Sequence, residues 1–244
     1  MKSRDILLET AEVLESTLDK IDRLKVLSEK EKEAVKTKLK NAAANFKKLA
    51  EEAEKDNEEL AEFFLKKAKE LKLASVDKKI EEMGKKEYLK LVNRIELYSR
   101  SAEYDFKPEK LAELKRVYRK YIFGMTSFFI LTGIYLNQFL AVTALILAIP
   151  IILSMLSLQR RGYLGLLLAY SAIPIPLIVG AMAASYGIRA LNDPAKIAEI
   201  AGHLNKSTTF AQGYLVVLTL LAAVELYLLI SAAVELYRHR HAFL

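Results

Sequence analysis

The charge of this chain is concentrated in its first half, and that concentration ends at residue 120. Residues 1–120 hold 30 of the 37 Lys and Arg residues and 26 of the 30 Asp and Glu residues. The other 124 residues hold 7 basic and 4 acidic residues, and residues 121–158 carry no charge at all. This contrast predicts two domains, residues 1–120 for water and residues 121–244 for hydrocarbon.

Helical patterns cover the first domain. Apolar residues recur at intervals of four and three along residues 5–27 and 29–54, as they do on one side of a helix that packs in a bundle or coiled coil. Two further helices are expected at about 57–73 and 76–102. We therefore predict an all-α protein whose first domain is an antiparallel helical bundle or coiled coil.

Residues that favour helix starts lie between these patterns. A side-chain oxygen can cap the free amides at a helix start, and proline fits the first turn. The expected start signals are Ser28 with Glu31, Asp56 with Glu59, Ser75 and Pro108. We expect the fifth helix, which begins at Pro108, to continue through Lys120 into the membrane.

Composition argues against several kinds of function. The chain has no Cys, which excludes disulfides and thiolate metal sites. The mixed-sign first domain nets 30 − 26 = +4 and shows no nucleic-acid-binding motif. We find no catalytic motif, so we expect no enzymatic activity, cofactor, metal or nucleic-acid partner. An intramembrane enzyme is the weakest of the hypotheses.

The second domain reads as a set of membrane-crossing helices. As one helix, residues 121–158 would be about 57 Å long, which is too long for one crossing, so we place a turn at Asn137-Gln138. The four crossings are expected at about 121–138, 139–158, 162–187 and 211–237. Between the last two, Asp193 and Pro194 can cap and start an interfacial helix at about 194–204.

Basic residues in the flanks orient these crossings. Eight flanking basic residues would lie on one side and three on the other, which places both termini in the cytoplasm of a multi-pass cell-membrane protein. No signal-peptide core precedes them. The eight residues, which we also expect to contact lipid head groups, are Lys115, Arg116, Arg119, Lys120, Arg160, Arg161, Arg238 and Arg240. Asn205, in an N-x-S triplet on the outer side, could be glycosylated, although such triplets also arise by chance.

Glu225 is the residue that a purely structural interpretation explains least well. It lies near the centre of the fourth crossing, where a charge costs about 2.5–3.5 kcal/mol on insertion scales. Such residues often mark an ion or proton path. The alternative is a protonated carboxyl that hydrogen-bonds a hydroxyl on a neighbouring helix.

Prolines occur at the same expected depth in two other crossings. Pro174 and Pro176 lie in the third crossing, and Pro150 lies in the second. Each proline frees a carbonyl one turn earlier, such as that of Tyr170, and freed carbonyls can bind cations or polar substrates. The residues therefore suggest a shared polar site with Glu225, although prolines in membrane helices often only kink them.

The hexapeptide Ala-Ala-Val-Glu-Leu-Tyr at residues 222–227 recurs at 232–237. Ten residues turn a helix by about 1000°, which leaves the copies about 80° apart. We interpret the repeat as accidental. Its second carboxylate, Glu235, is expected at the inner interface beside Arg238 and His239, where a salt bridge would explain it.

Two functions from different classes fit these patterns. The first is a non-enzymatic membrane protein whose residues 1–107 bind a protein partner or a second copy. The second is a small oligomeric channel or transporter that uses the polar site around Glu225.

Overall fold

The computed structural model describes residues 1–134 and 138–244, and it describes side chains outside 135–141. Within these ranges the chain is helical and has no strand, which confirms the predicted all-α class. It divides into two compact units, Met1–Glu113 and Leu114–Phe243. This division falls before residue 120, inside the helix that begins at Pro108.

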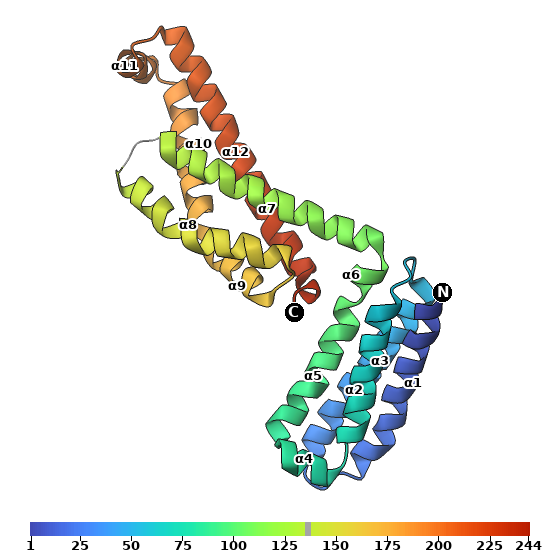
Figure 1. Cartoon of the computed structure of the whole chain (residues 1–244). Coiled ribbons are helices and arrows are strands. Elements are labelled where there is room, and N and C mark those ends of the chain that lie inside the picture. Colours follow the sequence, from blue (N-terminus) through green and yellow to red (C-terminus); the bar gives the residue numbers. More distant parts are fainter. Residues whose placement is uncertain (135–137) are drawn as a thin grey trace. The chain divides into compact units, whose positions relative to one another are not determined.

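The first unit contains six helices and the start of a seventh (Figure 1). They are α1 (Lys2–Asp22), α2 (Glu29–Glu52), α3 (Glu58–Ala74), α4 (Asp77–Met83), α5 (Lys85–Ser101), α6 (Glu103–Phe106) and α7 (Pro108–Ile134). Helix α1 packs on α2 and α3, and α2 packs on α5. The core includes Leu14, Leu39, Phe46 and Phe64, and the rings of the two Phe residues lie 5.3 Å apart between centroids.

The expected fourth helix, 76–102, is two helices. Gly84 interrupts it with φ = 86°, a conformation that glycine adopts without steric cost. Ser75 does not cap the fourth helix as predicted, because Val76 is the residue before α4. The Ser75 hydroxyl instead donates to the Leu71 carbonyl and lies 3.0 Å from the Tyr88 hydroxyl.

The two predicted capping boxes have different outcomes. The box at Ser28 is present: its amide donates to the Glu31 carboxylate over 2.9 Å, and its hydroxyl accepts from the Glu31 amide. The prediction of a capping box at Asp56 is wrong. Asn57 caps α3, because the Asp56 carboxylate accepts a hydrogen bond from the Ser3 amide, one of the free amides of α1.

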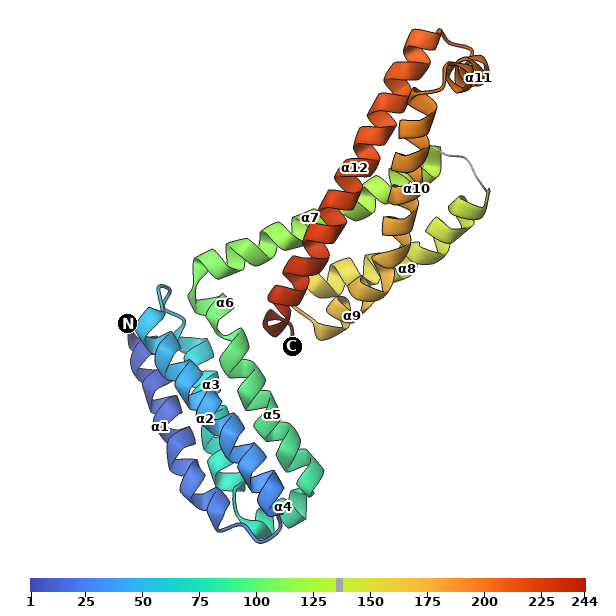
Figure 2. The ribbon, with the colours of Figure 1, turned by 180° about the vertical axis from the view of Figure 1, so that it is seen from behind.

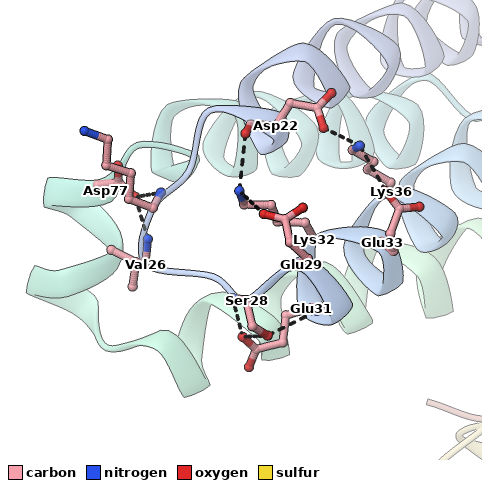
Figure 3. A network of polar contacts seen from close by, with 10 residues as sticks. Asp22, Val26, Ser28, Glu29, Glu31, Lys32, Glu33, Lys36 and Asp77 are labelled. Carbon is pink, nitrogen blue, oxygen red and sulfur yellow. Dashed lines mark hydrogen bonds and ion pairs between the residues drawn. The ribbon is translucent and has the colours of Figure 1, made fainter.

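Charged side chains also join the loops at one end of this bundle (Figure 3). The Asp77 carboxylate accepts from the Lys25 and Val26 amides, at 2.8 and 3.1 Å, and so ties the α1–α2 loop to α4. Lys85 of α5 lies 2.6 Å from the Glu31 carboxylate of α2. This ion pair, with the hydrogen bonds at the start of α2, lowers the pKa of Glu31 to about 2.

The second unit holds the rest of α7 and the remaining helices (Figure 2). These are α8 (Gln138–Gln159), α9 (Tyr163–Ala172), α10 (Pro174–Leu191), α11 (Pro194–Leu204), α12 (Thr208–Arg238) and the short 3₁₀ helix η1 (Arg240–Ala242). Helices α8 and α9 pack as one hairpin, α10 packs along α12, and α11 packs on both.

Three stretches of the described chain are long and apolar enough to cross a membrane: Val142–Gln159, Tyr163–Leu191 and Thr208–Arg238. Helix α7 is not among them. Its uncharged part runs from residue 121 to 134 within the described chain, which is shorter than the roughly 20 residues that a crossing needs. Asn137, half of the predicted turn after it, lies outside the described residues.

The ends of the other expected elements can be located. The expected third crossing is divided at Ile173, between α9 and α10, where Pro174 begins a new helix. Helix α11 begins at Pro194, and the Asp193 carboxylate accepts from the backbone amides of its first turn. Asn205 ends α11 in the left-handed conformation, with φ = 51°, and its side chain is exposed.

Candidate functional site

Glu225 lies near the middle of α12 and is completely buried, with 0% of its surface exposed. Neither of its carboxyl oxygens has a hydrogen-bond partner among the described residues. An unpaired carboxyl in such a place loses the water that would otherwise solvate it. The predicted structural alternative, a hydrogen bond to a hydroxyl on another helix, is absent from the described contacts.

The backbone of α10 covers this carboxyl. A Cβ atom added to Gly180 would lie 2.9 Å from Oε2 of Glu225 and 3.3 Å from the side chain of Leu226. A side chain at position 180 would push the carboxyl aside. Glu225 therefore faces a neighbouring helix of its own unit.

Two more glycines bring helices close to α12. A Cβ on Gly124 of α7 would lie 2.6 Å from the Leu229 side chain, and a Cβ on Gly187 of α10 would lie 2.0 Å from the Thr219 hydroxyl. No local sequence pattern identifies these two glycines, because a glycine's contact depends on where two distant helices cross. Small residues at such crossings are typical of helix packing in membranes.

The three prolines that were expected at the depth of Glu225 have different surroundings. Pro150 lies inside α8, Pro174 is exposed, and Pro176 is buried at the start of α10. The Tyr170 hydroxyl donates to the Ala233 carbonyl over 3.4 Å. Ala233 lies about two turns beyond Glu225 on α12. A polar site that these residues share with Glu225 stays a prediction.

The second acidic residue of α12, Glu235, has strong partners. It lies 2.5 Å from the Lys120 ammonium of α7, and the Ser231 hydroxyl donates to it over 3.1 Å. Both charged side chains of the pair are about a quarter exposed. The pair uses Lys120 of α7, which lies far from Glu235 in the chain and which the sequence assigned to lipid head groups.

The remaining basic residues fall into two groups. Arg161 donates to the Ala242 carbonyl over 3.0 Å, so it holds the C-terminal turn. Arg240 lies over the Tyr237 ring, 4.5 Å from its centroid. The others have exposed side chains, as lipid head-group contacts require; they are Lys115, Arg116, Arg119, Arg160 and Arg238.

The described residues bring together no group of three or more His, Cys, Asp or Glu side chains that could hold a metal. Comparisons with family models, with curated proteins and with solved structures found no match for this chain.

Proposed function

We propose that this chain is a polytopic protein of the cell membrane whose N-terminal helical domain docks a protein partner or a second copy in the cytoplasm. The observation that carries the proposal is the coincidence of two divisions. The dense charge ends at residue 120, seven residues after the end of a compact bundle with its own core, and three long apolar helices follow. A bundle of this kind needs no bilayer, and the apolar helices have no comparable polar surface.

The topology that accompanies this proposal has four crossings, with α7 contributing the first, and both termini in the cytoplasm. The Lys120–Glu235 and Arg161–Ala242 contacts place basic residues of α7, of the α8–α9 turn and of the C-terminal segment near one end of the second unit. Basic residues that flank membrane helices collect on the cytoplasmic side. The location of these residues at one end of the unit therefore supports an even number of crossings.

The absence of Cys allows a direct test of sidedness. Single substitutions Asn41→Cys and Asn205→Cys place thiols on two exposed positions, one in each unit. A membrane-impermeant maleimide applied to intact cells should label position 205 and should label position 41 only after lysis. Labelling of position 41 in intact cells would overturn the orientation, and recovery of the chain without detergent would overturn the membrane assignment.

Docking is tested by association. The most exposed large apolar residues of the first unit are Leu73 at 61% and Met1 at 51%, and Val76 beside Leu73 is 46% exposed. We expect the purified chain to form oligomers or a defined complex, and the double variant Leu73→Ser/Val76→Ser to lose them while staying helical. A wild-type chain that stays monomeric and captures no partner would contradict the docking role.

A second function is favoured by one observation, the buried and unpaired carboxyl of Glu225. Under this alternative the chain conducts ions or protons past Glu225. In reconstituted vesicles, Glu225→Gln should abolish flux, and the matched variant Glu235→Gln should retain it. Absence of flux in the wild type under both proton and sodium gradients would exclude the alternative.

A further inference from the structure

An apolar cavity of about 450 Å³ lies between α10, α11 and α12, beside the last described turn of α7. Its volume falls within the range of ordinary small-molecule sites, about 300–1,000 Å³. Helix α11 forms one wall because Ile197 and Ala201 pack it against the ends of α10 and α12. The cavity therefore lies where α11 connects the two apolar helices α10 and α12.

Polarity changes along the depth of this cavity. His203 of α11, Tyr186 of α10 and Tyr214 of α12 line it with polar groups. At 1.5 Å per residue, the two tyrosines lie about 8 and 9 Å from the helix ends next to α11. These three side chains form the polar end of the cavity, which we call its rim.

Below the rim the lining is apolar. Val179 lies about 18 Å from the end of α10, and Leu218 lies about 15 Å from the start of α12. One leaflet of a bilayer contributes about 15 Å of hydrocarbon, half of a core of about 30 Å. Its deepest lining residues thus lie about one leaflet from the helix ends, and from the tyrosines down the lining runs about 11 Å along α10 and about 6 Å along α12. The cavity ends before Glu225, which lies further along α12.

One wall of the cavity includes an exposed residue. Met182, one of its lining residues, is 63% exposed on the surface of α10. If α10 and α12 cross a bilayer, that surface meets lipid tails and not water. A ligand entering there comes from the membrane.

We propose that this cavity binds one acyl chain of a membrane phospholipid, with the head group at the rim formed by Tyr186, His203 and Tyr214. This inference rests on the proposed membrane location of the second unit. It does not depend on docking by the first unit or on conduction at Glu225. A lining that is polar at one end and apolar at the other, with the exposed Met182 in one wall, suits an amphiphile better than a water-soluble ligand.

The experiment uses the absence of Trp from the chain. Met182→Trp places one fluorophore at the mouth of the cavity, and Val217→Trp places one on α12 at a position that does not line it. The two native side chains are equally exposed, at 63%. Full-length protein in detergent micelles is titrated with phosphatidylcholine whose chains carry bromine, which quenches Trp on contact.

We expect half-maximal quenching at position 182 at a lipid fraction about tenfold below that at position 217, with saturation at one lipid per chain. Ala183→Phe, which fills the cavity from its lining, should abolish this difference. Ala181→Phe is the matched control, because Ala181 is exposed on the same helix and should leave the difference unchanged.

Equal quenching at positions 182 and 217 would overturn the proposal, and this comparison stands even if Ala183→Phe fails to fold. Absence of quenching at 182 together with a stable dimer would also overturn it, because a second copy would then cover the cavity. A chain that is soluble without detergent would instead refute the membrane assignment, so the two failures are distinguishable.

Discussion

Two identical hexapeptides on α12, residues 222–227 and 232–237, place their carboxyls in opposite surroundings. Glu225 is fully buried and has no hydrogen-bond partner among the described residues. Glu235 is partly exposed and is bound by Lys120 and Ser231. The sequence around each carboxylate is the same, so it does not determine the environment of either one.

The difference comes from the helices that face α12. Gly180 of α10 brings a bare backbone against Glu225, whereas α7 brings Lys120 to Glu235. The ten-residue spacing turns the two copies toward different neighbours. A carboxylate in such a helix acquires its chemistry from the element that packs on it.

The largest expected effect comes from filling the space at Gly180. Gly180→Ala should lower the free energy of unfolding by about 1–2 kcal/mol, because the new Cβ would lie 2.9 Å from Oε2 of Glu225 and the buried carboxyl would have to move aside. Adding Glu225→Ala should recover most of that loss, and unfolding in mixed micelles with increasing SDS measures both. Gly213→Ala is the control: nothing lies within 4 Å of that position, so it should stabilise α12 by about 0.5–1 kcal/mol. Equal effects at the two glycines would contradict the close approach.

Methionine at the two acidic positions should act with opposite signs. Glu225→Met replaces a buried, unpaired polar group with an apolar one of similar length and should stabilise the fold by about 1–2 kcal/mol. Glu235→Met removes a partner of Lys120 and should destabilise it by less than about 1 kcal/mol. Both are read from the same SDS titration. Destabilisation by both variants would show that the Glu225 carboxyl has a hydrogen-bond partner.

A double-mutant cycle isolates the Lys120–Glu235 pair. Because each side chain is about a quarter exposed, we expect a coupling free energy of about 0.5–1 kcal/mol. Lys120→Met, Glu235→Met and the double variant are compared at low and high salt in the same unfolding assay. A coupling of zero at low salt would show that the pair is incidental to the packing of α7 on α12.

The smallest expected effect concerns Glu31, whose carboxylate accepts hydrogen bonds from Ser28 and forms an ion pair with Lys85. Its folded-state pKa of about 2 lies below the ordinary value of 4.5, so its ionised form favours folding. The advantage of the wild type over Glu31→Gln should be complete above about pH 4.5 and should disappear as the pH falls toward 2. Thermal unfolding of the first unit across that range measures it. A difference that is constant with pH would show that Glu31 acts through shape and not through charge.

Much of the fold could be predicted from local pattern. The apolar spacing along residues 29–54 predicted one buried side of a helix, and Val35, Leu39, Phe46 and Leu49, which follow that spacing, are all buried in α2. This works because burial on one side of a helix repeats with the helical period. Likewise, Pro108 begins α7, which continues without interruption through Lys120.

What could not be predicted depended on contacts between distant segments. Asp56 was expected to cap its own helix, but it binds the Ser3 amide, which the fold brings next to it. Glu225 was identified from its rarity, yet its surroundings depend on Gly180, which no local pattern links to it. Spacing shows which side of a helix is buried and does not show what covers it.

Under the proposed membrane location, the close fit of Gly180 over Glu225 also bears on how the chain would be inserted during synthesis. A lone apolar helix with a carboxyl at its centre costs about 2.5–3.5 kcal/mol more to insert than one without it. Helix α10 leaves the ribosome before α12, and α11 joins the two through a short connection. Entry as a hairpin would cover Glu225 at the moment it leaves water, so we expect the translocon to handle α10 and α12 as one unit.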